Sequence, residues 1–534
     1  MTANSATSDV PTTDGIPSLR DVLAPLPLSG EMRQWDEATQ ALGIPALLLM
    51  ENAGFAAARL LASLRPVAGA RIWCLMGSGN NGGDAACLAR HVKDMGASPL
   101  MVLAKPPESL APTAAEHFAM AKACGVEHVR LADLPSEPLP DVLVDGLLGT
   151  GFSGELRPDL REIVDRVNGL APGRFVFALD VPSGLDADRG VPCPVAVRAD
   201  ATVCFGAGRF GVCLPEARPY VGTVHVASIG IPAGLASTLP CSGLLLDARA
   251  LRLAPAMLAD GHKHAFGHVA ILGGGEGMHG AALLAARGAL RAGAGLVTVA
   301  APSPAFSPSL PETMTCALRG TPMPEAWPED PPPHLLRLLS RCRAMVAGPG
   351  MGHEAGPLLR RLLDLPHRPP AVIDADALRL LGMDRELFGR LTEDDILTPH
   401  PGEAEALLGE SIKDRGACLE ALVSLSRASV VLKGAGTRVG RRGSPTLLSP
   451  YDVPQLAVAG SGDVLAGCCG ALLAAGLPGL HAAALGVCLH ALAGKRLRQD
   501  FPARGNTASE VADTLPAVRT PPPPGDPGRL PWPN

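Results

Sequence analysis

The chain has 534 residues, 47% of them hydrophobic and 18% charged, so it is long enough for two domains and too apolar to be disordered. A net charge of −6 and the lack of any run of Lys or Arg argue against a nucleic-acid partner. The 13 scattered cysteines, with no C-x-x-C pair, favour reduced thiols in the cytoplasm over disulfides or a zinc site.

Residues 1–29 lack the apolar stretch of a signal peptide and are predicted to be a flexible N-terminus. An amphipathic helical stretch follows over 32–64. From Ile72 onward, β-branched runs alternate with alanine-rich stretches, a pattern typical of a parallel sheet covered by helices in three α/β/α layers. We expect a first domain over 30–235 with strands at 71–76, 99–104, 141–145 and 174–180 and helices at 84–95, 112–123 and 158–168.

A glycine-rich loop follows the first of these strands. Residues 77–82 read "GSGNNG" and fit the dinucleotide pattern G-x-G-x-x-G, but the next strand ends in Lys105 instead of the acidic residue that would bind a ribose. The pattern therefore argues against a dehydrogenase. Asn80, Asn81 and Asp84 supply oxygens, and the helix start supplies N–H groups, for a polar or phosphorylated ligand. Alternatively, the asparagines are turn residues with positive φ and Asp84 is an N-cap.

Two more polar loops, at 145–156 and 180–190, follow predicted strands. Because ligands bind at the carboxyl ends of parallel strands, Asp145, Asp180 and Ser183 are expected at the same edge of the sheet as the asparagines. Oxygen donors without histidine or cysteine suit a hard cation. Each aspartate could instead cap a turn.

In this order, "LMENAG", "GSGNNGGD", "VDGLLGTGFSG" and "ALDVPSGLDAD" resemble the NAD(P)H-hydrate epimerase (YjeF N-terminal) family, over about residues 30–235. The resemblance implies a Rossmann-like fold, a potassium ion bound by Asn81, Asp145 and Ser183, and a catalytic Asp180. Arg209 stands where the family commonly has a lysine, and a guanidinium cannot act as a neutral base. The implied substrate contacts are Asp180 with Asn80, Asn81, Gly82, Gly83, Asp84, Gly149, Thr150, Gly151, Phe152, Ser153, Gly154 and Glu155.

The pattern weakens over 229–243, which we take as a linker, and a second α/β domain is expected over 236–510. The stretch 464–494 has no Asp, Glu, Lys or Arg, but "LPG" at 477–479 divides it into halves too short to span a membrane, so we predict two core helices and no membrane partner. Residues 511–534 are predicted to be a Pro-rich tail. The expected strands are 268–274, 295–302, 344–350, 371–378, 396–403 and 429–437, with a helix at 279–292.

A second glycine turn, "AGSGDVLAG" at 459–467, opens an apolar helix. A helix beginning at Gly462 and Asp463 directs its N–H groups and positive dipole at a phosphate, and the aspartate can take a proton from a substrate hydroxyl. Alternatively, Asp463 merely caps the helix. The segments "GPGMG" (348–352), "DADAL" (374–378), "TPHPGE" (398–403) and "KGAGT" (433–437) favour the functional interpretation.

Together these segments resemble the ribokinase-like NAD(P)H-hydrate dehydratase family over about 250–505, although "VPQLAVAGSGD" and "HKHAFG" depart from its usual motifs. The resemblance implies Asp463 as the catalytic base, Mg²⁺ with ADP or ATP, and substrate contacts at Gly350, His400 and Asp463. The implied nucleotide contacts are Lys433, Gly434, Ala435, Gly436, Thr437 and Gly462.

The two resemblances together imply repair of hydrated NADH and NADPH. The first domain would exchange the R and S hydrates, and the second would dehydrate the S form at the expense of ADP or ATP. We expect a cytoplasmic homo-oligomer whose partners are small molecules. The alternative is a vitamin or sugar kinase fused to a non-catalytic binding module.

Overall fold

The computed structural model describes residues 16–134, 137–152, 154–255, 262–303, 310–318 and 326–520. The chain forms two compact units. The N-unit is residues 24–245, and the C-unit combines residues 16–23 with 246–520. The boundary along the chain lies between Leu245 and Leu246, whereas the sequence alone suggests 235–236.

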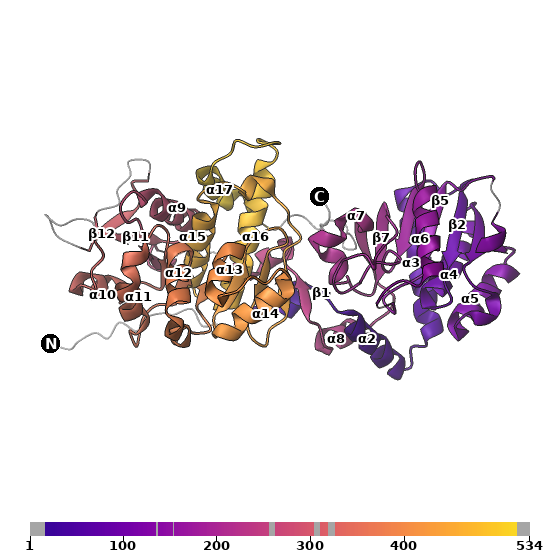
Figure 1. Cartoon of the computed structure of the whole chain (residues 1–534), viewed down its shortest axis with the longest axis horizontal. Coiled ribbons are helices and arrows are strands. Elements are labelled where there is room, and N and C mark those ends of the chain that lie inside the picture. The colour runs from indigo at the N-terminus through magenta and orange to yellow at the C-terminus, as the bar shows by residue number, and fades with distance from the viewer. Residues whose placement is uncertain are drawn as a thin grey trace. The chain divides into compact units, whose positions relative to one another are not determined.

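The N-unit contains a parallel sheet in the order β4-β3-β2-β5-β6-β7-β8. Helices α3, α4 and α5 cover one face of this sheet and α6 covers the other (Figure 1). The strands are β2 (Arg71–Met76), β3 (Ser98–Leu103), β4 (Glu127–Arg130), β5 (Val142–Gly146), β6 (Phe175–Leu179), β7 (Ala201–Phe205) and β8 (Thr223–Ala227). The helices are α2 (Ser29–Ala41), α3 (Ala46–Leu64), α4 (Asn80–Asp94), α5 (Pro112–Ala123), α6 (Pro158–Leu170), α7 (Arg218–Val221) and α8 (Ala233–Thr238).

The predicted amphipathic stretch 32–64 is two helices. Gly43 has a φ of +89° and Pro45 is the N-cap of α3, so the chain turns between α2 and α3. Among the described residues, α3 is the one helix long and apolar enough to cross a membrane. Its Ala57 and Leu61 are completely buried in the core beneath the sheet, as expected of a core helix.

The C-unit sheet runs β18-β17-β16-β15-β14-β13-β10-β11-β12, parallel from β16 to β12 and antiparallel at β16-β17-β18. Helices α9, α15, α16 and α17 pack together on one face, while α11 to α14 form a core with the other (Figure 1). The strands are β10 (His268–Leu272), β11 (Leu296–Ala301), β12 (Met314–Ala317), β13 (Ala344–Ala347), β14 (Ala371–Ile373), β15 (Ile396–Leu397), β16 (Ser429–Leu432), β17 (Arg438–Gly440) and β18 (Thr446–Leu448). The helices are α9 (His279–Arg291), α10 (Pro333–Leu339), α11 (Gly356–Leu363), α12 (Ala375–Met383), α13 (Pro401–Leu408), α14 (Arg415–Leu425), α15 (Ser461–Ala474), α16 (Gly479–Leu497) and α17 (Ala508–Thr514).

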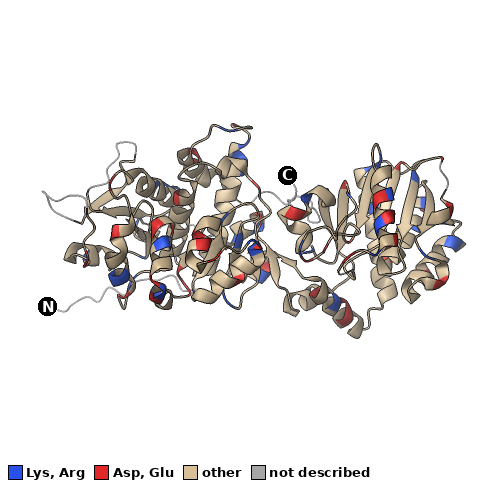
Figure 2. Ribbon diagram, viewed as in Figure 1, with Lys and Arg blue, Asp and Glu red and all other residues tan. Residues whose placement is uncertain are grey.

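The stretch 464–494, which has no Asp, Glu, Lys or Arg, lies in two core helices, as predicted. Helices α15 and α16 are buried along most of their length, and the break between them includes Pro478, the N-cap of α16. The prediction of an α/β protein of two domains with mostly parallel sheets is therefore confirmed. Figure 2 shows, in this view, Lys and Arg interspersed with Asp and Glu, for example along α6.

Three segments predicted to be irregular contain regular structure. Within the predicted flexible N-terminus, α1 (Leu19–Val22) buries Leu19 and Val22 in the C-unit, and β1 (Ala24–Leu26) pairs with β9 (Gly243–Leu245) in the N-unit. The predicted linker 229–243 contains α8 and the first residue of β9.

The predicted tail contains the end of α17 and a 3₁₀ helix over Leu515–Val518, because Val511, Ala512 and Leu515 are buried. Residues 521–534 of that tail, and residues 1–15, lie outside the described residues. Sequence patterns miss these elements because they are short and gain their stability from tertiary burial.

Candidate functional sites

The loop after β2 lies so close to other main-chain atoms that it requires glycine. A Cβ at Gly77 would lie 1.8 Å from the carbonyl oxygen of Leu147, and one at Gly82 would lie 2.1 Å from that of Gly77. Helix α4 begins at Asn80, with Gly79 as its N-cap. Its amino terminus therefore lies at the carboxyl edge of the sheet, where the sequence predicted a ligand site.

The alternative interpretation of this loop is wrong. Asn80 and Asn81 are the first two helical residues, and among the described non-glycine residues only Asp180 and Ala375 have positive φ. Asp84 lies one turn into α4, where it is buried and does not act as the N-cap. These polar side chains therefore belong to the first turns of α4 and are not turn residues.

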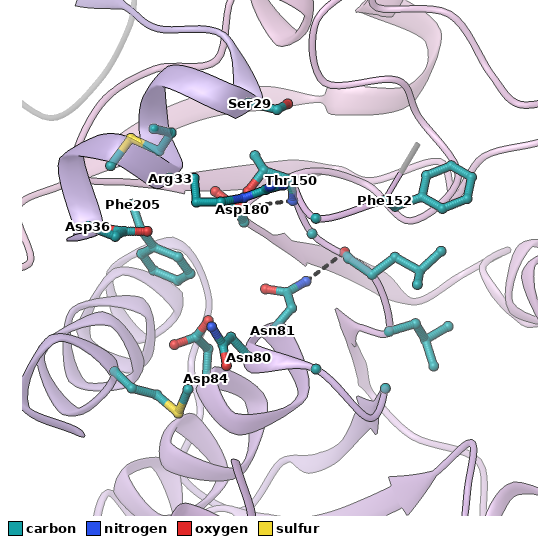
Figure 3. Close-up of a pocket in the computed structure, with 18 of the residues that line it drawn as sticks. Ser29, Arg33, Asp36, Asn80, Asn81, Asp84, Thr150, Phe152, Asp180 and Phe205 are labelled. Atoms are coloured by element: carbon teal, nitrogen blue, oxygen red, sulfur yellow. Dashed lines mark hydrogen bonds between the residues drawn. The ribbon is translucent and has the colours of Figure 1, made fainter. Parts of the chain in front are cut away.

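Main-chain carbonyls fix the Asn81 amide. Its Nδ2 donates to the oxygens of Leu148 at 2.7 Å (Figure 3) and Leu179 at 3.0 Å. Its Oδ1 is buried and has no hydrogen-bond partner among the described residues. The structure therefore leaves a buried, oriented amide oxygen with no donor among the described residues.

Asp145 and Ser183 form a buried pair beside this loop. The Ser183 hydroxyl donates to Asp145 Oδ1 at 2.6 Å, and the Ser183 N–H donates to Oδ2 at 2.8 Å. The Leu148 N–H donates to Ser183 Oγ at 2.9 Å. Burial raises the pKa of Asp145 to about 6, although these hydrogen bonds oppose the rise. No Lys, Arg or His pairs with Asp145 in the part of the chain that the structure describes.

Asp180 and Arg209 form a buried ion pair. Arg209 Nη2 donates to Asp180 Oδ1 at 2.6 Å and to the Phe205 oxygen at 3.0 Å. The Thr150 N–H donates to Asp180 Oδ2 at 3.1 Å. Asp180 has a φ of +63°, a conformation that costs an aspartate on the order of 1 kcal/mol. Such strain is common where a side chain must be aimed at a ligand.

These groups surround a cavity of about 780 Å³. Asp36 and Arg33 project from α2 on one side, and Asn80, Asn81 and Asp84 project from α4 on another (Figure 3). The predicted contacts that line the cavity are Asn80, Asn81, Asp84, Gly149, Thr150, Gly151, Phe152, Glu155 and Asp180.

Other predicted residues of this site lie around the cavity without lining it. Gly82 and Gly83 are buried in the first turns of α4, and Asp145 and Ser183 lie behind the lining residues. Gly154 does not line the cavity, and Ser153 lies outside the described residues.

Asp36 was missed from the sequence. Burial raises its pKa to about 6, with Arg209 opposing the rise and Asp180 and Glu37 adding to it. Burial likewise raises the pKa of Asp84 well above its usual value, and Asp180 and Asp36 add to the effect. Asp36 lies in an amphipathic helix far from the glycine loops, so no local motif marks it.

A second polar centre lies at the amino terminus of α15. Gly460, with a φ of +84°, is the N-cap, so Asp463 does not cap the helix and lies in its first turn. A Cβ at Gly462 would lie 3.3 Å from Lys433 Nζ and 3.9 Å from Asp374 Oδ2. The residues that directly follow β14 and β16 thus meet the first turn of α15.

Lys433 joins the carboxylates of this centre. Its Nζ donates to Asp374 Oδ1 at 2.8 Å and lies 3.6 Å from Glu403 Oε2. Burial alone would lower the pKa of Lys433, but Asp374 and Glu403 raise it. Burial also raises the pKa of Asp463 to about 7, with Asp374 and Glu403 adding to the rise and Lys433 opposing it.

The other predicted residues of the C-unit lie in neighbouring loops. Gly434 and Gly436 have φ of +132° and +60°, and Thr437 Oγ1 donates to the Gly434 oxygen, so residues 433–437, Ala435 among them, form a tight turn after β16. His400 is the N-cap of α13, and its Nδ1 accepts from the N–H groups of Gly402 and Glu403. Gly350 has a φ of +61°, and a Cβ there would lie 2.7 Å from the Met278 oxygen.

Asp374 and Glu403 were not assigned individually from the sequence, although the segments that contain them, "DADAL" and "TPHPGE", were recognised as informative. Each follows the end of a parallel strand, β14 or β15. This position, after the carboxyl end of a parallel strand, was the signal that could have identified them as site residues.

Two family models match the chain: "YjeF-related protein N-terminus" over residues 46–211 and "NAD(P)H-hydrate dehydratase" over residues 269–517. A bifunctional NAD(P)H-hydrate repair enzyme from Moorella thermoacetica is 35% identical over 520 residues, which cover 92% of this chain and 96% of the relative. The Escherichia coli enzyme of the same name is 33% identical, covering 91% and 92%. A solved ribokinase-like superfamily protein from Enterococcus faecalis, 24% identical, covers 52% of this chain and 95% of its own, with a TM-score of 0.46.

Replacing Asp463 with asparagine should stabilise the C-unit above pH 7. The pKa of Asp463 rises from 3.8 to about 7 on folding, so the unfolded chain ionises first and stability falls as pH rises through this window. The Asp463→Asn variant should gain up to about 4 kcal/mol at pH 8 and nothing near pH 4, since one pKa unit corresponds to about 1.4 kcal/mol.

Amide hydrogen exchange of peptides from β13 and β10 at increasing urea would measure this, because those amides report unfolding of the C-unit alone. Glu405→Gln, which neutralises an exposed carboxylate on α13, is the control and should show no such pH-dependent gain. Equal stability of the Asp463→Asn variant and the wild type at pH 8 would show that folding does not raise the pKa of Asp463.

Proposed function

The chain belongs to the bifunctional NAD(P)H-hydrate repair enzymes, and we propose that each unit carries one of the family's two activities. It is an NAD(P)H-hydrate epimerase and an ADP- or ATP-dependent NAD(P)H-hydrate dehydratase. The epimerase model matches residues within the N-unit and the dehydratase model matches residues within the C-unit. The alternative of a vitamin or sugar kinase is not favoured, since relatives of the same name match both halves of the chain.

The observation that carries the dehydratase assignment is the position of Asp463, a half-buried carboxyl in the first turn of α15 with a pKa raised to about 7. Such a group can accept the proton of the ring hydroxyl of the S hydrate while that oxygen attacks a phosphoryl group. The N–H groups of α15 favour the negative charge of the transferred phosphate. Phosphate then leaves more readily than hydroxide, which explains kinase architecture in a lyase.

The charges of this centre fit a divalent cation. Asp374, Glu403 and Asp463 supply three carboxyl groups, whereas Lys433 pairs with Asp374 and Glu403 and His400 Nε2 lies 3.4 Å from Glu403 Oε1. Asp374 and Glu403 would hold Mg²⁺, which when bound neutralises phosphate charge. Lys433, Gly434, Ala435, Gly436, Thr437 and Gly462 would contact the nucleotide, and Gly350 and His400 the hydrate.

In the N-unit, the hydrate would bind in the cavity between α2 and α4. Epimer exchange needs the ring hydroxyl to leave as water and water to return on either face of the ring. Arg209 stays protonated and is held by Asp180, so it cannot supply a neutral base. Asp36, with a pKa of about 6, can give and take the proton, and the carboxylate of Asp180 can stabilise the cationic ring formed between the two steps.

A potassium ion fits beside this cavity. Asn81 Oδ1 is a buried oxygen without a donor, and Asp145 is a buried carboxyl without a basic partner among the described residues. Ser183 Oγ supplies a third oxygen. Neutral and acidic oxygens of this kind suit a hard cation. The ion would hold the loop 147–151 against α4.

The 13 cysteines include no disulfide among the described residues, which fits a reducing cytoplasm. A homo-oligomeric state stays a prediction.

Two matched variants test the assignment. Asp463→Asn removes the base and should lower dehydration about 100-fold or more, while epimer exchange continues. Asp180→Asn keeps the size of the side chain and tolerates the left-handed φ, but it removes the charge that holds Arg209. It should slow exchange while the S hydrate is still consumed.

Chromatography of the two epimers with time, in the presence of ADP or ATP, measures both rates in one sample. Loss of exchange in Asp463→Asn, or normal exchange in Asp180→Asn, contradicts the two-site assignment. A stable phosphorylated product would indicate a kinase instead.

Epimer exchange should depend on the protonation of Asp36. If the protonated carboxyl is the acid, the exchange rate falls as pH rises through about 6, and Asp36→Asn both lowers the rate and flattens this profile. Glu162→Gln, which neutralises an exposed carboxylate on α6 away from the cavity lining, should keep the profile. An unchanged profile in Asp36→Asn would assign the proton to another group.

Potassium chloride should raise the unfolding temperature of the N-unit more than tetramethylammonium chloride at equal ionic strength, because an ion bound only to the folded state stabilises it. Ser183→Ala removes one oxygen and should shift the response to higher potassium concentration. Identical curves for the two salts would remove the support for a potassium site.

A further inference from the structure

A second group of metal-binding side chains lies where α3, α4 and α5 pack together, apart from the cavity residues. Glu51 comes from α3, Cys87 from α4 and His117 from α5, and one donor atom of each lies within 4.8 Å of the other two. Glu51 Oε2 lies 3.4 Å from Cys87 Sγ and 3.7 Å from His117 Nδ1. The donor atoms of a tetrahedral zinc ion, at bond lengths of about 2.0–2.3 Å, lie about 3.3–3.6 Å apart.

The histidine is oriented as a ligand. His117 is completely buried, and its Nε2 lies 3.3 Å from the Leu47 carbonyl oxygen, which can only accept a hydrogen bond. Nε2 therefore carries the proton, and Nδ1 presents a lone pair toward Glu51 and Cys87. Nδ1 has no hydrogen-bond partner among the described residues. A main-chain carbonyl that fixes the far ring nitrogen is the usual support of a metal-bound histidine.

The carboxylate is held from outside the group. Arg90 Nη2 lies 2.6 Å from both oxygens of Glu51, and His91 Nε2 lies 2.8 Å from Oε1. Burial alone would raise the pKa of Glu51, but these hydrogen bonds lower it to about 2. Glu51 is thus ionised, and its Oε2 faces Cys87 and His117. About one third of its side chain is exposed, which leaves a path for an ion.

From this geometry we propose that Glu51, Cys87 and His117 bind a zinc-type transition metal ion. Sulfur, imidazole nitrogen and carboxylate oxygen are the donors that zinc prefers, and three protein ligands leave a fourth position for water. Binding releases the thiol proton of Cys87 to solvent and satisfies the buried lone pair of His117. The ion braces α3 and α5 against α4, the helix whose first residues line the cavity.

No sequence motif announces this site. The three ligands come from three helices and are separated along the chain by 36 and 30 residues. The lack of a C-x-x-C pair, which argued against a zinc site in the sequence, therefore does not exclude this one. Only the packing of the helices brings the ligands together.

Cobalt(II) titration of the full-length protein, freed of metal by dialysis, tests the site. The wild type should bind one equivalent with a thiolate-to-cobalt absorption band and the strong visible bands of tetrahedral cobalt. Cys87→Ser should lose the thiolate band, and His117→Gln should weaken binding at least tenfold. Cys124→Ser, which removes the exposed cysteine at the end of α5, should behave as the wild type.

Zinc should also raise the unfolding temperature of the wild type and of Cys124→Ser but not that of Cys87→Ser. Circular dichroism tests whether each variant is folded before titration. If Cys87→Ser is unfolded, the cobalt affinity of His117→Gln tests the site instead. A wild type without the thiolate band, or a band that survives in Cys87→Ser, overturns the proposal.

Discussion

A carboxylate withdrawn from water must be paired, hydrogen-bonded or protonated, and both sites of this enzyme are organised around that requirement. In the N-unit, Asp180 is paired with Arg209, while Asp145 is hydrogen-bonded by Ser183. In the C-unit, Asp374 takes the charge of Lys433 and Asp463 is left with a pKa near neutrality. The same burial that costs stability thus creates groups that exchange protons under physiological conditions.

The sequence predicted the features that glycine and parallel topology control. Gly77 and Gly82 admit main-chain approaches that no side chain allows, so their loop could be recognised without a structure. Asp145 lies at the carboxyl end of β5 and Asp180 directly follows β6, and all parallel strands point their carboxyl ends the same way. Both signals are local to the chain, which is why the glycine loops and the α/β class were predictable.

The remaining features depend on packing between distant elements. Asp36 reaches the cavity only because α2 packs across the sheet edge, and Lys433 meets Asp374 only because β14 and β16 end together. His117 acquires its unpaired nitrogen from the way α5 packs on α3. None of these relations has a fixed spacing in sequence, so a single chain without a structure cannot reveal them.

The contribution of residues 16–23 to the C-unit sets an order of events during synthesis. Helix α1 leaves the ribosome first, but its partner in the C-unit, the 3₁₀ helix Ala248–Leu253, follows more than 200 residues later. At a translation rate of about 5–20 residues per second, the apolar side chains of α1 remain without their partner for on the order of 10–40 s. The contiguous N-unit can fold during that interval. The nascent chain can therefore complete the N-unit before the C-unit is able to close, and the apolar side chains of α1 stay unburied during that interval.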